Sequence, residues 1–158
     1  MERLKETLCD LPEINAERGL RFSVNNVRNY RKSLYMVLKS IKFKLPLILM
    51  MVEENEYEGL SIIVHTLMQL LNNIGAESLM QECLQIETLL LNDNKDELDT
   101  ALENYVESLA GFMVRLEALM PAIDTLVASE LELEGDASLK MERANHLVEE
   151  FNPKRKTV

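Results

Sequence analysis

The chain has 158 residues, 47% of them hydrophobic, and a formal net charge of −10 at pH 7. This length suits one domain with a true core, and the small number of glycines and prolines favours helices over a sheet protein. The acidic balance argues against general nucleic-acid binding, because most of the surface would repel phosphate backbones.

The remaining composition argues for a protein of the cytoplasm. The longest apolar run, residues 45–52, is far shorter than the roughly 18 residues that a bilayer-spanning helix needs. No cleavable signal sequence opens the chain, so we expect cytoplasmic localisation and no membrane association. The two cysteines, Cys9 and Cys83, have no partner motif, and we interpret them as free thiols rather than a disulfide.

The N-terminal part is predicted as a short segment, residues 2–9, and a loop over residues 12–22. The first long helix should begin near Asn25 or Asn26, since asparagine is a favourable N-cap residue. Its inward face should carry Tyr30, Leu34, Val37, Leu38 and Ile41. Pro46 then kinks this helix or restarts it.

A second long helix is predicted from about residue 56 to residue 73, with Gly75 ending it. At about 100° per residue, the apolar side chains share one side of this helix. They are Leu60, Ile63, Leu67, Leu70, Leu71 and Ile74. The opposite side carries Glu58, Ser61, His65, Gln69 and Asn72. His65 is therefore expected to face solvent and partners rather than the core.

A third helix is predicted over residues 76–91, a loop near residues 92–96 and a fourth helix from about residue 95 to residue 119. The apolar positions of the fourth helix are Leu98, Leu102, Val106, Leu109, Met113 and Leu116. Four long helices with short connections predict an all-α, up-and-down antiparallel four-helix bundle over residues 11–120.

Residues 121–151 are predicted to form a C-terminal helical appendage to this bundle. Pro121 should interrupt the fourth helix, the acidic stretch after it should break at Gly135, and an extra amphipathic helix should span residues 137–151. The basic tail, residues 152–158, should be disordered. The appendage can pad the bundle, pair with another copy or lead into a linker, and the sequence leaves these three open.

The stretch of residues 64–87 contains a motif built around the histidine. Its residues are His65, Thr66, Leu67, then Gly75 and Ala76, with Leu79 and Glu87 continuing the pattern. This motif resembles that of the histidine-containing phosphotransfer (HPt) domain family. The resemblance extends over most of the chain, from about Leu11 to Leu119.

The resemblance implies a phosphorelay carrier in two-component signalling. His65 would be the phosphoacceptor, taking a phosphoryl group from the aspartyl phosphate of a receiver domain and passing it on, without any kinase activity of its own. The implied partners are a receiver (response regulator) domain or a hybrid histidine kinase. No cofactor or metal of the chain's own is expected, and Mg²⁺ is expected on the receiver.

Two residues depart from the family motif, which has Lys-Gly where this chain has Met68 and Gln69. Met68 cannot pair with phosphoryl oxygens, and Gln69 either covers His65 or donates a hydrogen bond to the phosphoryl group. Receiver docking or phosphoryl contacts are assigned to Ser61, Met68, Gln69 and Asn72. The missing positive charge could come from Lys39, Lys42 or Lys44, within the stretch 18–44, which has eight bases and no acid.

Three functions follow from these observations. The preferred one is the active phosphocarrier; the alternatives are a degenerate domain that docks a receiver without efficient transfer, and a structural helical module. The basic stretch also has a plain interpretation as a solvated face that balances the acidic residues 51–150. Gly-rich phosphate loops, metal-ligand clusters and nucleophile–base pairs are not found in the sequence.

Overall fold

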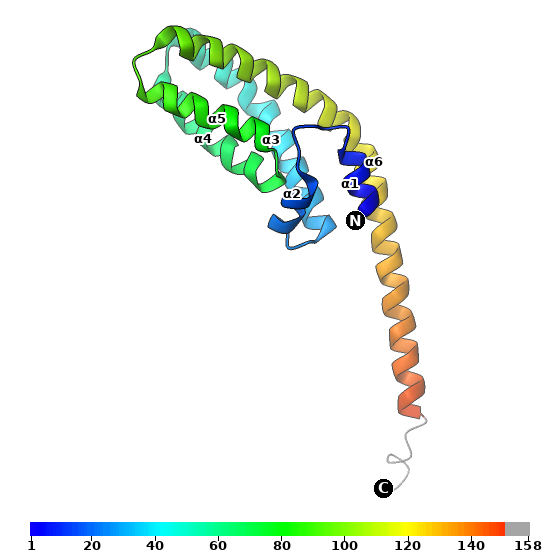
Figure 1. Ribbon diagram of the computed structural model, residues 1–158. Helices are drawn as coiled ribbons and strands as arrows, with labels where there is room; N and C mark the ends of the chain where they lie inside the picture. Colours follow the sequence, from blue (N-terminus) through cyan, green and yellow to red (C-terminus); the bar gives the residue numbers. More distant parts are fainter. Residues whose placement is uncertain (151–158) are drawn as a thin grey trace.

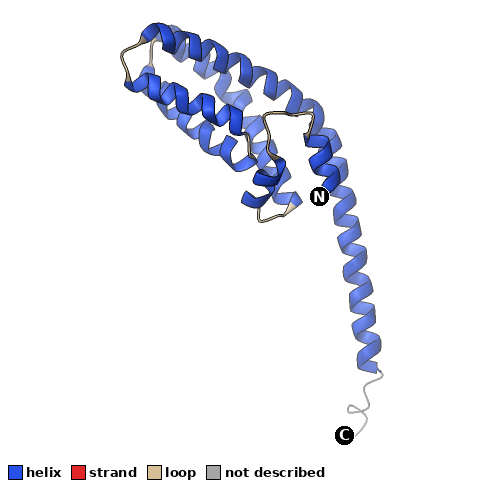
Figure 2. Cartoon of the chain, in the orientation of Figure 1, coloured by secondary structure: helices blue, strands red, loops and turns tan. Residues whose placement is uncertain are grey.

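The computed structural model describes residues 1–150, and the side-chain environment of residues 1–147. Within these residues the chain is helical and forms no β-strand. The helices are α1 (Glu2–Leu8), α2 (Ala16–Phe22), α3 (Val27–Glu54), α4 (Tyr57–Ile74), α5 (Glu77–Leu91) and α6 (Lys95–Glu150). Figure 2 shows short connections between the bundle helices and a longer loop between α1 and α2. The predicted basic tail lies outside the described residues.

Helices α3, α4, α5 and α6 form an antiparallel bundle in which each packs against its two neighbours (Figure 1). The contacting pairs are α3 with α4, α4 with α5, α5 with α6, and α6 with α3. This arrangement confirms the predicted all-α bundle. Helix α1 lies against α6, and α2 contacts α3 and α4.

Local sequence signals account for most helix boundaries. The side chain of Asn26 accepts a hydrogen bond from the Asn29 backbone N–H at 3.0 Å, so the predicted cap starts α3. Gly75 ends α4 with a φ of 79°, a left-handed conformation that favours glycine. Pro46 lies inside α3 and does not restart it, because Ile41 and Ile48 on either side are fully buried.

The core is one cluster built from the inner faces of all six helices. All five predicted inward residues of α3 are buried, which confirms that periodicity. In α6 the prediction was partly wrong, since Tyr105 and Phe112 are fully buried while Val106 and Met113 lie at the edge of the core. At these two turns of α6, the buried position is therefore one residue earlier than predicted.

The predicted loop over residues 12–22 is wrong in its second half, where the chain forms α2. The Asn15 side chain accepts from the Arg18 backbone N–H at 3.1 Å and caps this short helix. Leu20 packs into the core, and a Cβ on Gly19 would lie 2.4 Å from the Ile74 backbone oxygen. Glycine thus permits α2 to touch the end of α4.

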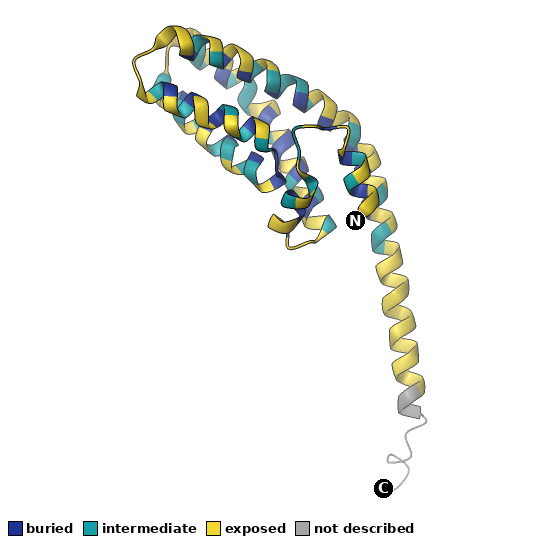
Figure 3. Ribbon diagram, in the orientation of Figure 1, coloured by how far each residue is buried: buried dark blue, intermediate teal, exposed yellow. Residues whose placement is uncertain are grey.

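The predicted breaks at Pro121 and Gly135 do not occur, because α6 is continuous through both residues. Met120, Ile123 and Val127 are buried around Pro121, where α1 covers α6 with Leu4 and Leu8. Each buried apolar side chain contributes about 1.5–3 kcal/mol, and together they exceed the roughly 3 kcal/mol cost of a helical proline. The extra C-terminal helix is consequently the end of α6, which extends beyond the bundle (Figures 1 and 3).

Candidate functional site

His65 lies on the outer side of α4, with 55% of its side chain exposed. Residues four before, four after and seven after it fall within about 40° of it on the helix surface. They are Ser61, Gln69 and Asn72, of which Gln69 is exposed and the other two are partly buried. The predicted polar face of α4 therefore surrounds the histidine.

Glu87 on α5 reaches across to the imidazole. Its Oε1 atom lies 2.7 Å from Nδ1 of His65, and 22% of its side chain is exposed. An ionised carboxylate can only accept hydrogen bonds, so Nδ1 is the nitrogen that carries the proton. In the neutral imidazole, Nε2 then holds the free lone pair and can act as a nucleophile.

Gln69 is the nearest polar side chain to that second nitrogen. Its amide Nε2 lies 3.5 Å from Nε2 of His65, at the outer limit of a hydrogen bond. The amide must swing aside before a phosphorus atom can approach the same lone pair, and from there it can donate to a phosphoryl oxygen. The geometry thus accommodates both roles considered for Gln69.

Met68 is partly buried, because it packs against the edge of the core. The exposed apolar groups beside the His65–Glu87 pair are instead Ile62, 65% exposed, and Leu84, 40% exposed. Ile62 precedes His65 by three residues on α4, and Leu84 precedes Glu87 by three residues on α5. Both therefore lie one helical turn from the pair.

Arg18 of α2 brings a positive charge to the same side of α4. Its guanidinium donates to Asn72 Oδ1 at 2.8 Å and to Glu77 Oε1 at 2.9 Å. Asn72 is seven residues beyond His65, which is a rise of roughly 10.5 Å along the helix. Asn72 is consequently held by α2, and the arginine was not recognised from the sequence because its partners are more than 50 residues away.

The three lysines assigned a compensating role lie on α3. The Lys42 ammonium pairs with Glu117 of α6, so its charge is used on the α3–α6 side of the bundle. Burial lowers the pKa of Lys44, and Lys39 is exposed. In the described part of the chain, none of the three forms a hydrogen bond or ion pair with His65, so their role at the site stays a prediction.

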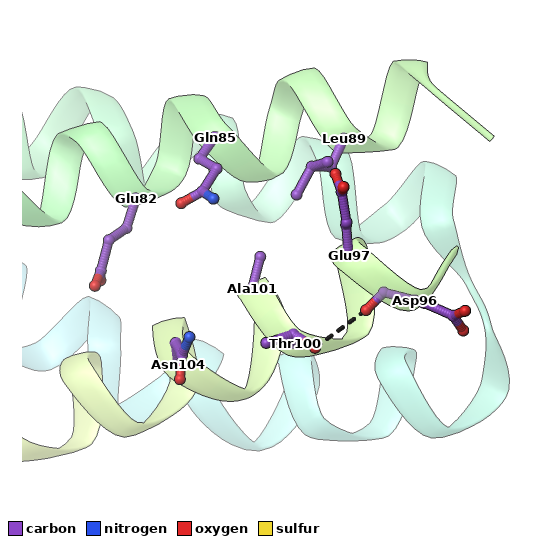
Figure 4. A pocket seen from close by; sticks show the side chains of 8 residues that line it. All are labelled: Glu82, Gln85, Leu89, Asp96, Glu97, Thr100, Ala101 and Asn104. Atoms are coloured by element: carbon purple, nitrogen blue, oxygen red, sulfur yellow. Dashed lines mark hydrogen bonds between the residues drawn. The ribbon is translucent and has the colours of Figure 1, made fainter. Parts of the chain in front are cut away.

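A hollow of about 460 Å³ between α5 and α6 is a separate feature of the surface (Figure 4). It is lined by Glu82, Gln85, Leu89, Asp96, Glu97, Thr100, Ala101 and Asn104. Ser108 donates to one carboxylate oxygen of Glu82 at 3.0 Å, and burial raises the pKa of this acid. Three of the lining residues are acidic, and His65 is not among them. The hollow is therefore distinct from the His65 site.

The cysteines are both free, as expected, with Cys9 exposed and Cys83 buried. The Cys83 thiol lies 3.3 Å from the Tyr105 hydroxyl, and burial raises its pKa to about 12. Such a thiol is protonated and unreactive near neutral pH. Cys83 is therefore a core residue.

Two features are absent from the described part of the chain. Among the side chains of residues 1–147 there is no cluster of three or more histidine, cysteine or acidic groups that could hold a metal ion. Over the same residues, no helix combines the length and the apolar content needed to cross a bilayer.

The chain was compared with protein-family models, curated proteins and solved structures, and none of them matches it. The candidate site accordingly rests on its own geometry. The fold defines an all-α helical bundle, and the exposed histidine on α4 distinguishes its surface.

Proposed function

We propose that this protein is a phosphocarrier of the HPt type, with His65 as the phosphoacceptor. The observation that carries the proposal is the 2.7 Å contact between His65 Nδ1 and Glu87 Oε1 on a histidine that is 55% exposed. It supports an imidazole held at Nδ1, with Nε2 within reach of a partner once the Gln69 amide moves aside. The sequence motif around the histidine points to the same chemistry.

In the proposed reaction, Nε2 of His65 attacks the phosphorus of a receiver's aspartyl phosphate. The N–P bond forms, the P–O bond to the aspartate breaks, and the aspartate leaves as a carboxylate. The imidazole gains positive charge, which the Glu87 carboxylate stabilises through the Nδ1–H bond. Passing the group to a second receiver reverses these steps.

The partner is proposed to be a receiver domain, alone or within a hybrid histidine kinase, that supplies the aspartate and Mg²⁺. The exposed side chains of Ile62 and Leu84 would contact it beside the histidine. Arg18 lies farther along that side of α4, where its guanidinium holds Asn72 and is paired with Glu77. The main contribution of the bundle would be to position the imidazole, because the receiver supplies the aspartate and Mg²⁺.

The direct test is transfer of labelled phosphate from phosphorylated receiver domains to the purified chain. We expect label on the wild type in an acid-labile, base-stable form, and we expect His65→Gln to abolish it. The matched control is His146→Gln, which changes the other histidine and should leave labelling intact. A wild type that receives no label from any receiver tested would contradict a carrier function.

The same assay separates the carrier from a domain that only docks a receiver. Gln69 beside Nε2 and the absence of a lysine at Met68 are the observations that favour docking alone. In a weakened carrier, Met68→Lys combined with Gln69→Gly should raise labelling sharply. Receiver binding without label in either form indicates docking alone, and the absence of both binding and label indicates a structural module.

A further inference from the structure

The outer side of α3 carries exposed apolar side chains in a regular row. Helix α3 packs against α2, α4 and α6, and the described residues place no helix on its remaining side. Met36, Phe43 and Met50 lie there at seven-residue intervals and are 59%, 72% and 45% exposed. All three fall within about 20° of the direction opposite the buried Leu34, and the row is roughly 21 Å long. An apolar row of this kind marks a contact surface.

Three bases accompany the apolar row. Lys32 and Lys39 lie within about 40° of Phe43 around the helix, and Arg28 lies within about 60° of it. All three are exposed, and no hydrogen bond or ion pair connects them to another side chain in the described part of the molecule. Two other bases of α3 are instead paired with acids of α6. The row and its three bases are here called the ridge.

The charge of α3 indicates what kind of molecule the ridge attracts. From Val27 to Val52 the helix contains six bases and no acid, and its two acids, Glu53 and Glu54, are its last residues. The whole chain has the opposite balance, with 17 bases and 27 acids. Charge complementarity therefore favours an acidic partner, and the exposed methionines and phenylalanine favour one with apolar anchors.

The neighbouring helices limit the width of that partner. Glu58 on α4, and Glu103 and Glu107 on α6, are exposed on the outer sides of the two helices that flank α3. A flat anionic surface such as a membrane would bring its charges against these acids. A single helix is only about 10–12 Å wide and can contact the ridge alone. Apolar residues at three- and four-residue intervals on such a helix match the seven-residue spacing of the ridge.

We propose that the ridge binds an acidic amphipathic helix of a partner protein. Phe43 packs between apolar side chains of that helix, with a methionine one heptad away on either side, and the three bases of the ridge pair with its carboxylates. The proposal does not depend on phosphotransfer, because His65 lies on α4 and contacts Glu87 of α5.

The first test measures binding of a labelled peptide to the full chain by fluorescence anisotropy. The probe is a synthetic helix of about 20 residues, longer than the ridge, with leucine at heptad positions a and d and glutamate and alanine elsewhere. We expect saturable binding that weakens as the salt concentration rises. A peptide with lysine in place of glutamate should bind at least roughly tenfold more weakly. Equal binding of the two peptides, or no binding of the acidic one, would overturn the proposal.

Variants of the chain then locate the binding site. Phe43→Ser should raise the Kd of the acidic peptide roughly tenfold or more, because a large apolar side chain leaves the contact. Lys32→Gln with Lys39→Gln should weaken binding and reduce its salt dependence. The matched controls are Leu91→Ser, at a leucine of α5 that is 88% exposed, and Lys95→Gln, at an exposed lysine of α6. Controls that weaken binding as much as the ridge variants do would refute the assignment to α3.

Two further measurements distinguish the other possible occupants of the ridge. We expect Phe43→Ser to leave the sedimentation-equilibrium mass of the chain unchanged, and we expect the wild type not to bind vesicles of phosphatidylserine and phosphatidylcholine. An oligomer that Phe43→Ser dissociates would assign the ridge to a second copy of the chain. Vesicle binding that Phe43→Ser abolishes would assign it to a membrane, and either result would overturn the proposal.

Discussion

At the scale of single residues, the informative contact is the one that selects a nitrogen of His65. An isolated surface imidazole exchanges its proton between two tautomers, and the Glu87 carboxylate favours the one protonated at Nδ1. The selected tautomer leaves the lone pair on Nε2, next to the Gln69 amide. The pair lies at the surface between α4 and α5.

Removing the carboxylate should slow phosphoryl transfer without abolishing it. A hydrogen bond to a charged group contributes about 1.5–3 kcal/mol, so Glu87→Leu should lower the single-turnover transfer rate roughly tenfold or more. The measurement is the rate of label transfer from a phosphorylated receiver under saturating conditions. Gln81→Leu, an exposed position on the same helix, serves as the control. Equal rates for both variants would show that Glu87 does not act on the imidazole.

The exposure of His65 followed from the sequence, but its neighbours did not all follow. Helical periodicity placed the histidine opposite the apolar stripe, because that pattern is local. Glu87 was recognised as part of the motif, without its contact to the imidazole. Arg18 was missed, since no local pattern links it to Asn72 and Glu77.

At the scale of elements, the carboxyl end of α4 is held by α2 and by Tyr30 of α3. The Tyr30 hydroxyl donates to the Ile74 backbone oxygen at 2.8 Å inside the core, and Asn15 N–H donates to the Gly75 oxygen at 2.8 Å. Gly19 also lies against the Ile74 carbonyl. These contacts orient the helix that carries His65.

Loss of the buried hydroxyl should weaken this junction. Tyr30→Phe leaves the Ile74 carbonyl without its donor, which typically costs about 1–3 kcal/mol. The expected decrease in the free energy of unfolding can be measured by urea denaturation. Tyr35→Phe removes the hydroxyl of a half-exposed tyrosine on the same helix and should change stability little. A Tyr30→Phe protein as stable as the control would contradict the contact.

At the scale of the whole molecule, the core contains one thiol and two tyrosine hydroxyls that burial keeps protonated. Burial raises the pKa of Cys83 from 9.0 to about 12 and raises the pKa values of Tyr105 and Tyr30 well above 10. Cys83 and Tyr105 also lie within 3.3 Å of each other between α5 and α6. Ionisation of this cluster is therefore linked to unfolding of the bundle.

Stability should consequently fall in alkali. Above about pH 9 the unfolded chain releases protons that the folded chain retains, so the free energy of unfolding decreases as pH rises. Each such group contributes a slope of up to roughly 1.4 kcal/mol per pH unit until its folded-state pKa is reached. Urea unfolding between pH 8 and pH 11 measures this slope. Cys83→Val should reduce it, whereas Cys9→Ser should not, and a flat profile for the wild type would contradict the buried cluster.

The sequence by itself determined the helices of the bundle, most of the inward faces and the exposure of His65. These features depend on short-range properties: side-chain periodicity, the Asn26 cap and the conformational freedom of Gly75. Only the tertiary structure decided which faces meet, and so placed Glu87 on the imidazole and Arg18 on Asn72. It also carried α6 through Pro121, because burial against α1 outweighs the local cost of proline, a balance that no local pattern records.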